Sequence, residues 1–110
     1  MVEILKIKDK EYKMRLTAMQ VCALERREGK GLLKLLGGIE EQGNIIEVVV
    51  KILHASLLDA HKDIKIELVY DMYDDLVEFE NYTIIEFTTL LENILKTAGL
   101  SSQTVIKEKK

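Results

Sequence analysis

The fold is decided by residues 3–18, EILKIKDKEYKMRLTA. Apolar and charged side chains alternate over residues 5–8 and again over residues 12–16, on either side of a charged turn at residues 8–11. A period of two on both sides of a turn predicts an antiparallel β-hairpin with one buried face. At Thr17 the period becomes helical. Because an isolated two-stranded hairpin is only marginally stable in water, this one must pack on the helices or pair its free edge with another chain.

Beyond the hairpin, which we place at residues 3–16, apolar spacing predicts five helices, at about 18–28, 31–36, 45–60, 65–79 and 84–98. The first and last helices begin with the capping boxes Thr17–Gln20 and Thr83–Glu86, in which a threonine hydroxyl and a side chain three residues later satisfy free amides. Glycines at 37 and 38 are expected to end the second helix, which leaves a loop at residues 37–44.

Residues 45–60 are apolar on nearly every side, and such a helix belongs at the centre of a bundle. The β-branched run at residues 45–50 is also compatible with a buried strand, but the length of the segment favours a helix. The last two helices are amphipathic. The core-facing stripe expected for the final helix is Ile84, Phe87, Leu91, Ile94, Leu95 and Ala98.

The length of 110 residues, with 47% apolar and 32% charged residues, indicates one domain at residues 1–100 and a flexible polar tail at residues 101–110. The predicted fold class is α+β, mostly α, with an N-terminal β-hairpin packed on a small bundle of four to five helices. No apolar run approaches the roughly 20 residues of a membrane span, and no secretory signal opens the chain. The single cysteine, Cys22, is expected to be a buried thiol in a reducing compartment.

The net charge of −3 is unevenly spread along the chain. Residues 1–34 hold nine Lys and Arg against five Asp and Glu, whereas residues 59–92 hold ten Asp and Glu against two Lys. This distribution could steer a partner or promote head-to-tail self-association, or it could describe two solvated faces without a partner. Nucleic-acid binding is not expected, because acidic residues would lie close to any basic patch.

Side chains capable of chemistry occur without the spacing that chemistry requires. His54 and His61 are seven residues apart, roughly 10 Å along a helix at 1.5 Å per residue, whereas helical zinc pairs use a spacing of four. Gly29-Lys30-Gly31 lacks the preceding strand and the following Ser or Thr of a phosphate loop. The fourth helix carries an acidic row, expected to be a solvated face or a partner-binding patch: Asp71, Asp74, Asp75 and Glu78. We therefore expect no enzymatic activity, no cofactor and no metal site.

Three sequence features carry a family resemblance. The hairpin contains the step Lys10-Glu11-Tyr12, and the segment LERREGKGLLKLL follows at residues 24–36. The final helix has the spacing Phe87, Leu90, Leu91, Leu95, Ala98 and Gly99. With a hairpin first, then an apolar helix and an acidic amphipathic helix, this order resembles the small tail assembly chaperones of long-tailed bacteriophages and prophages of Gram-positive hosts. The resemblance covers roughly residues 3–100.

The resemblance implies a non-enzymatic helper in the cytoplasm of the bacterial host. Such chaperones bind the tape measure protein, a long helical chain that sets tail length. They help to recruit tail tube subunits around it and are absent from the finished virion. Many exist in a short form and in a longer form made by ribosomal frameshifting, and this chain would be the short form. The alternative is a small phage or bacterial regulatory or inhibitory module that binds one protein.

Two sets of residues are candidates for partner binding. An apolar groove for a client helix would be lined by the last two helices, with Met72, Tyr73, Phe87 and Leu91, although the pattern favours a plain core role for all four. The hairpin would contribute an exposed edge, through which copies could associate along the client, and the charges Lys6, Lys8, Lys13 and Arg15.

Overall fold

A computed structural model of the chain describes residues 2–100, and for residues 38–42 the backbone alone. It contains an N-terminal antiparallel hairpin of β1 (Glu3–Ile7) and β2 (Lys10–Met14), followed by five helices. The predicted class, mostly α with a small β part, is confirmed. The predicted tail at residues 101–110 lies outside the described residues.

The helices are α1 (Ala18–Glu28), α2 (Leu32–Gln42), α3 (Ile45–Leu57), α4 (Ile66–Phe79) and α5 (Ile84–Thr97). Four of them match the predicted segments to within three residues at each end. α1 begins where the Thr17 hydroxyl accepts a hydrogen bond from the Gln20 amide (3.2 Å), and α5 begins with the predicted capping box, in which the Thr83 amide donates to Glu86 Oε1 (2.7 Å).

The second helix is longer than predicted, and the loop expected at residues 37–44 is reduced to residues 43 and 44. α2 continues through Gly37 and Gly38 to Gln42. A glycine inside a helix costs about 1 kcal/mol relative to alanine, which the packing of Leu32 and Leu35 into the core can offset. The glycine that ends the helix is Gly43, whose φ of +69° is the left-handed conformation typical of a residue just after a helix.

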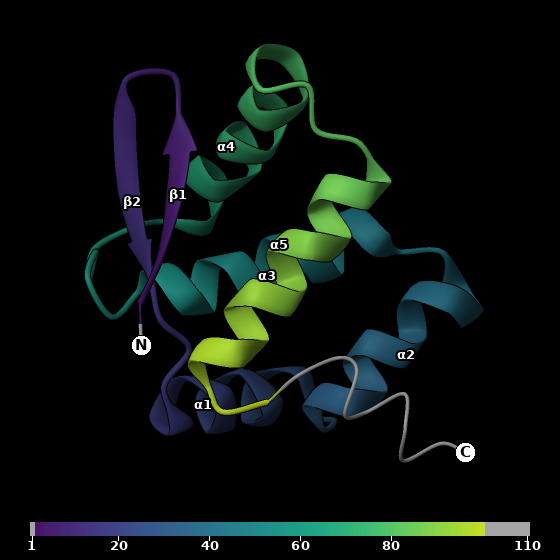
Figure 1. The fold of residues 1–110 in the computed structure, drawn as a ribbon. Coiled ribbons are helices and arrows are strands. Elements are labelled where there is room, and N and C mark those ends of the chain that lie inside the picture. Colours follow the sequence, from purple (N-terminus) through teal and green to yellow (C-terminus); the bar gives the residue numbers. More distant parts are fainter. Residues whose placement is uncertain (1, 101–110) are drawn as a thin grey trace.

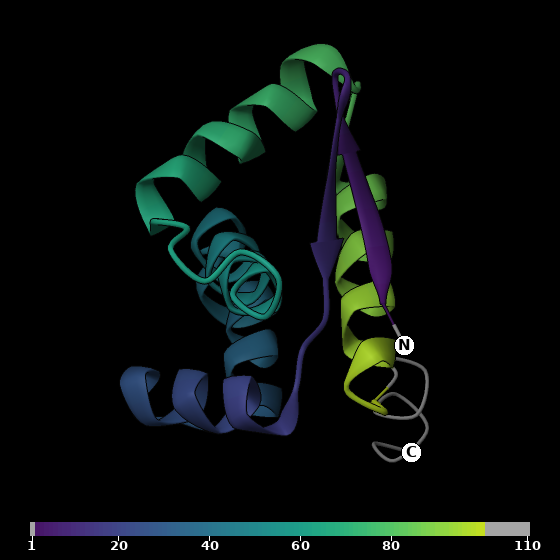
Figure 2. The ribbon, with the colours of Figure 1, turned by 90° about the vertical axis from the view of Figure 1, so that its left-hand side faces the viewer.

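α3 forms the centre of the molecule, as its apolar character predicts, and the alternative of a strand at residues 45–50 is excluded. All of its residues from Val48 to Leu57 except Lys51 are buried. α3 contacts all four other helices, and it also contacts β2. Figure 2 shows α3 nearly end-on, with α4 above it, α1 below it, and the hairpin and α5 on one side.

The hairpin packs its inward face on the helices (Figure 1). Its alternation is confirmed, because Leu5, Ile7, Met14 and Leu16 are buried whereas Lys6 and Lys13 are exposed. Beyond β2 the backbone is tied to the helices by two hydrogen bonds. The Arg15 amide donates to the Ser56 carbonyl oxygen (2.8 Å), and the Leu16 amide donates to Thr97 Oγ1 (2.8 Å). The docked hairpin is therefore an integral part of the core.

Two side chains predicted to be buried are exposed. Cys22 is exposed on the outer face of α1, so its thiol is not a core group. The buried residue of this helix is Leu24. Ile84 was expected in the core-facing stripe of α5, but it is 56% exposed, and Leu90 joins Phe87, Leu91, Ile94 and Leu95 in the core instead. Periodicity alone could not place these residues, because it marks an apolar face but does not state which part of that face neighbouring elements cover.

Candidate protein-binding groove

The four apolar candidates on the last two helices come together, but inside the molecule. Met72, Phe87 and Leu91 are buried in the core, and Tyr73 is partly buried. The rings of Tyr73 and Phe87 stack with their centroids 4.3 Å apart, and the Tyr82 ring meets Phe87 edge-on at 5.1 Å. These contacts join α4 to α5, so in this conformation the cluster holds the fold together and offers little surface to a client.

The four basic candidates lie on the hairpin and do not form one cluster. Lys8 Nζ lies 3.9 Å from Asp75 Oδ2 and 4.3 Å from the centroid of the Phe79 ring, so Lys8 fastens the tip of the hairpin to α4. Lys6, Lys13 and Arg15 are exposed. Because exposed ion pairs contribute at most about 1 kcal/mol, the contacts of Lys8 add orientation more than stability.

The outer edge of β2 is largely closed by the rest of the chain. The register pairs Tyr12 with Leu5, which leaves the peptide groups of Lys13 and Arg15 pointing away from β1. The Lys13 amide donates to His61 Nε2 (3.3 Å), and the Arg15 amide donates to the Ser56 carbonyl oxygen. His61, from the segment after α3, also packs its ring against Tyr12 at 5.6 Å. An incoming strand would have to displace these partners.

The outer edge of β1 is open over a short stretch. At the tip of the hairpin the Lys8 amide donates to Glu80 Oε2 (2.8 Å). The two positions below it that point the same way are Ile4 and Lys6. No described residue outside the hairpin hydrogen-bonds to their peptide groups. Exposed strand edges of this kind are templates for another strand.

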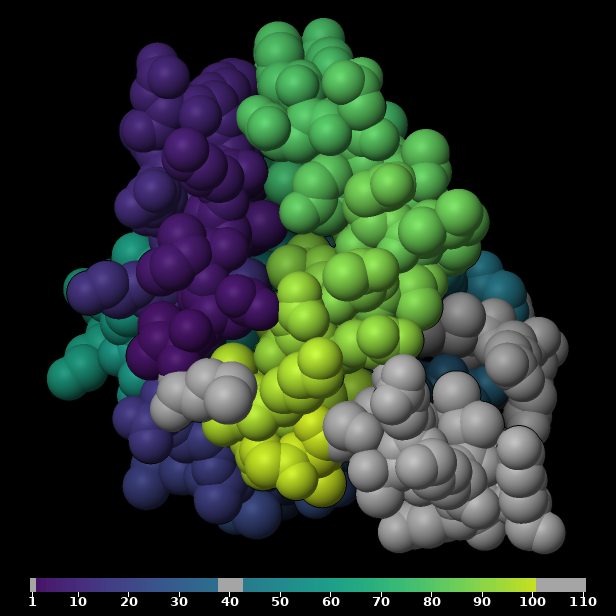
Figure 3. All heavy atoms as spheres, viewed as in Figure 1, coloured from purple at the N-terminus to yellow at the C-terminus, as the bar shows by residue number. Residues whose placement is uncertain are grey.

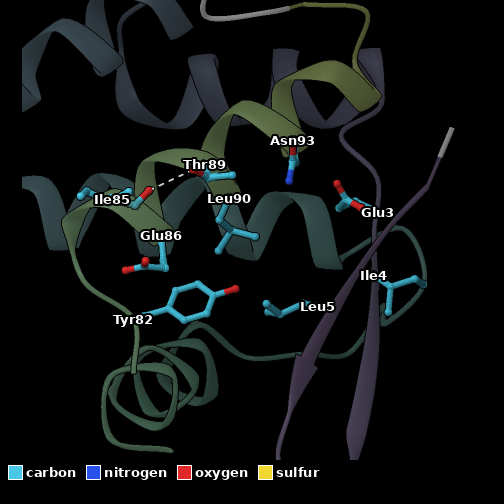
Figure 4. A pocket seen from close by; sticks show the side chains of 9 residues that line it. All are labelled: Glu3, Ile4, Leu5, Tyr82, Ile85, Glu86, Thr89, Leu90 and Asn93. Atoms are coloured by element: carbon cyan, nitrogen blue, oxygen red, sulfur yellow. Dashed lines mark hydrogen bonds between the residues drawn. The ribbon is translucent and has the colours of Figure 1, made fainter. Parts of the chain in front are cut away.

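A groove runs beside this open edge, between β1 and α5, and we call it the β1–α5 groove. Its volume is about 240 Å³. In the space-filling view it is the seam between the hairpin and α5 (Figure 3). Figure 4 shows its lining, with the Tyr82 hydroxyl directed toward Leu5 across the floor. The lining residues are Glu3, Ile4, Leu5, Tyr82, Ile85, Glu86, Thr89, Leu90 and Asn93.

The groove combines an apolar floor with acidic surroundings. Leu5 and Leu90 are buried beneath it. Burial raises the pKa of Tyr82, and the carboxylates of Glu80, Glu86 and Glu3 raise it further by opposing a negative phenolate. At neutral pH the tyrosine is therefore a neutral hydroxyl that can donate or accept a hydrogen bond, and the charge around it is negative.

Two isoleucines stand at the borders of the groove with much of their surface in solvent. Ile4 is 46% exposed and Ile85 is 70% exposed. Sequence reasoning missed both as functional candidates. A signal was present, because Ile4 breaks the alternation of β1 on its charged face and Ile85 falls outside the apolar stripe of α5. An apolar residue on a face that the period assigns to solvent is a candidate for contact with a partner.

The histidines have separate local contacts. Nε2 of His54, buried on α3, lies 3.0 Å from the Ile64 carbonyl oxygen, and His61 accepts from β2. Among the residues whose side chains the structure describes, 2–37 and 43–100, no group of three or more His, Cys, Asp or Glu side chains is placed to hold a metal ion. Across the same residues, no helix combines the length and apolar character needed to cross a membrane.

Comparison of the chain with protein-family models, with curated proteins and with solved structures finds no match.

Proposed function

We propose that the protein is a tail assembly chaperone of a long-tailed bacteriophage or prophage. In this role it binds the tape measure protein and helps to recruit tail tube subunits during tail assembly, in the cytoplasm of the bacterial host and outside the finished virion. The observation that carries the proposal is the N-terminal hairpin docked on five helices. That order of elements, together with the residue spacings at 10–12, 24–36 and 87–99, is the basis of the resemblance to these chaperones.

The surface we assign to the client is the β1–α5 groove. The predicted apolar cluster around Phe87 is occupied by contacts within the fold. The groove, by contrast, offers an open strand edge and two exposed isoleucines. Polypeptide recognition commonly uses such a strand edge next to pockets for alternate side chains. A chaperone that holds its client only during assembly needs a contact that can be released, and a short edge of this kind provides one.

Co-expression with the tape measure protein encoded in the same genome tests the proposal. The tagged chain should retain overlapping fragments of the tape measure protein through affinity purification and gel filtration, and should keep them soluble. Tube subunits should be retained when the client is present. Failure of every fragment to co-purify, or detection of the chain in finished virions, contradicts the proposal. Stable capture of one regulatory enzyme in place of the tape measure protein would favour the inhibitory-module alternative.

A matched pair of variants locates the contact. Ile85→Lys and Ile46→Lys both change an exposed isoleucine at the second position of a helix, and only Ile85 borders the groove. We expect Ile85→Lys to weaken client retention by about tenfold, the equivalent of about 1.4 kcal/mol, and Ile46→Lys to leave it unchanged. Equal effects of the two substitutions would show that the client binds elsewhere.

A further inference from the structure

We infer that the β1–α5 groove binds an extended, basic polypeptide segment, which adds to the open edge of β1 as a third strand. The inference rests on the proposed function in one respect, that a polypeptide partner uses this groove. It goes further in stating the backbone conformation and the charge of the segment. A strand edge pairs with an extended backbone and not with a helix, so the segment would be a non-helical stretch of the polypeptide that uses the groove.

The backbone of the hairpin supports strand addition at β1 only. On the β2 side, the outward amide of Lys13 donates to His61, and that of Arg15, just beyond the strand, donates to Ser56. This leaves Glu11, next to the turn, as the open position on β2. Ile4 and Lys6 together present two amides and two carbonyl oxygens on the open side, with the spacing of an antiparallel or parallel ladder. Lys8 closes the far end through Glu80, so the added strand would be short.

The groove also selects the side chains of the segment. Residues of an added strand point alternately toward α5 and toward solvent. Those that point toward α5 would lie over Leu90 and Thr89. The carboxylates of Glu3 and Glu86 line the same groove. Lysine and arginine fit this environment, because their aliphatic stems cover apolar surface while the charged ends reach acidic groups. Those that point toward solvent would lie beside Ile4, which suits a β-branched apolar residue.

Charge argues against a second copy of this chain as the occupant. The strand most available for self-pairing is β1 itself, and antiparallel pairing would bring the partner copy's β1 alongside the same groove. The inward face of β1 carries Glu3, Leu5 and Ile7, with no basic residue. Pairing centred on Leu5 would place the second Glu3 near Glu80 and Glu86, a like-charge arrangement that opposes association.

Titration with two synthetic peptides tests the inference. One is a seven-residue peptide in which lysine alternates with valine, and the other replaces each lysine with glutamate. Fluorescence anisotropy should show saturable binding of the lysine peptide, weakened by added salt, and at least tenfold weaker binding of the glutamate peptide. Amide hydrogen exchange at Ile4 and Lys6 should slow at least tenfold in the complex, while exchange at Glu11 on the other edge stays unchanged.

Variants separate a specific site from general charge attraction. Glu3→Lys should weaken binding of the lysine peptide at least tenfold, whereas Glu67→Lys, the same charge change at an exposed position on α4, should have little effect. Thr89→Lys repeats the test from the α5 side without changing the hairpin. Circular dichroism and thermal unfolding establish that each variant is folded.

Several outcomes would overturn the inference. They are equal binding of the two peptides, binding without added protection at Ile4 and Lys6, and equal loss in Glu3→Lys and Glu67→Lys. A free protein that is dimeric by light scattering, with Ile4 and Lys6 already protected, would assign the edge to a second copy. The peptide experiment tests which kind of segment binds in the groove, and the tape measure experiment tests which protein is the client. Either proposal can therefore fail without the other.

Discussion

At the scale of single residues, the capping box of α5 links one carboxylate to both the fold and the groove. Glu86 Oε1 accepts from the Thr83 amide and from the Thr83 hydroxyl. These hydrogen bonds favour the charged carboxylate and lower the pKa of Glu86 below its ordinary value. The same carboxylate lines the β1–α5 groove. The residue that starts the helix therefore also supplies part of the negative charge that a basic partner would meet.

This lowered pKa predicts a pH dependence of stability. The stabilising contribution of Glu86 is fully present above the pKa of an unfolded glutamate, about 4.3. It is lost as the pH falls through the lower folded-state pKa, because protonation removes the acceptor charge. Thermal unfolding of the protein and of Glu86→Gln should therefore differ most near neutral pH and converge in acid. A difference in melting temperature that stays constant between pH 7 and pH 3 would contradict this assignment.

At the scale of elements, the two outer edges of the hairpin differ in whether other segments hydrogen-bond to them. β2 is bound by groups from the end of α3 and the segment that follows it, and β1 is left open beside α5. The asymmetry has a geometric cause. β2 leads directly into α1 and packs on the central helix α3, whereas β1 packs on α4 and α5 and has α5 beside its outer edge (Figures 1 and 2).

Glycine substitutions test the observed course of α2. A Cβ at Gly37 would meet none of the described atoms within 4 Å apart from the backbone of its own helix, and the backbone at Gly37 is helical. Gly37→Ala should raise the free energy of unfolding by about 0.5–1 kcal/mol, since alanine loses less backbone entropy in a helix. Urea denaturation measures the change.

Gly29→Ala is the matched control. This glycine also has open space around it, but its φ of +72° is strained for alanine, so this substitution should lower stability. Destabilisation by Gly37→Ala would indicate that the chain is not helical at that residue in solution, as the loop prediction proposed.

At the scale of the whole molecule, stability is concentrated in the contacts of α3. The buried side chains of α3 pack against the other helices and β2, and the inward face of the hairpin belongs to the same core. A domain of this size has a total stability of about 5–15 kcal/mol. A single truncated side chain at the centre should therefore lower the stability of the whole domain, including the hairpin that borders the candidate groove.

Truncation at the centre of α3 tests this view. Leu53 is fully buried, and Leu53→Ala should lower the free energy of unfolding by about 2–5 kcal/mol, through lost burial and the cavity left behind. Ile46→Ala, on the same helix but 47% exposed, should change it by less than about 0.5 kcal/mol. Urea denaturation followed by circular dichroism gives both values. Similar losses for the two variants would mean that α3 does not occupy the centre.

The sequence by itself determined the local structure. The switch from a period of two to a helical period at Thr17 places the hairpin and the first helix, and the apolar character of residues 45–60 places the central helix. These features are readable because they depend on neighbours within a few residues. The course of the chain through Gly37 was not readable in this way. A helix interrupted by glycine persists only when distant packing supports it, and Leu32 and Leu35 supply that packing.

Only the tertiary structure decided where a partner could bind. The β1–α5 groove joins residues 3–5 to residues 82–93, at opposite ends of the described chain. Its open edge exists because His61 and Ser56 close the other strand and not this one. Apolar periodicity marks residues that need burial, but it does not state which buried residues end beneath a surface groove and which exposed ones border it. That difference depends on the docking of the hairpin, which is a property of the assembled molecule.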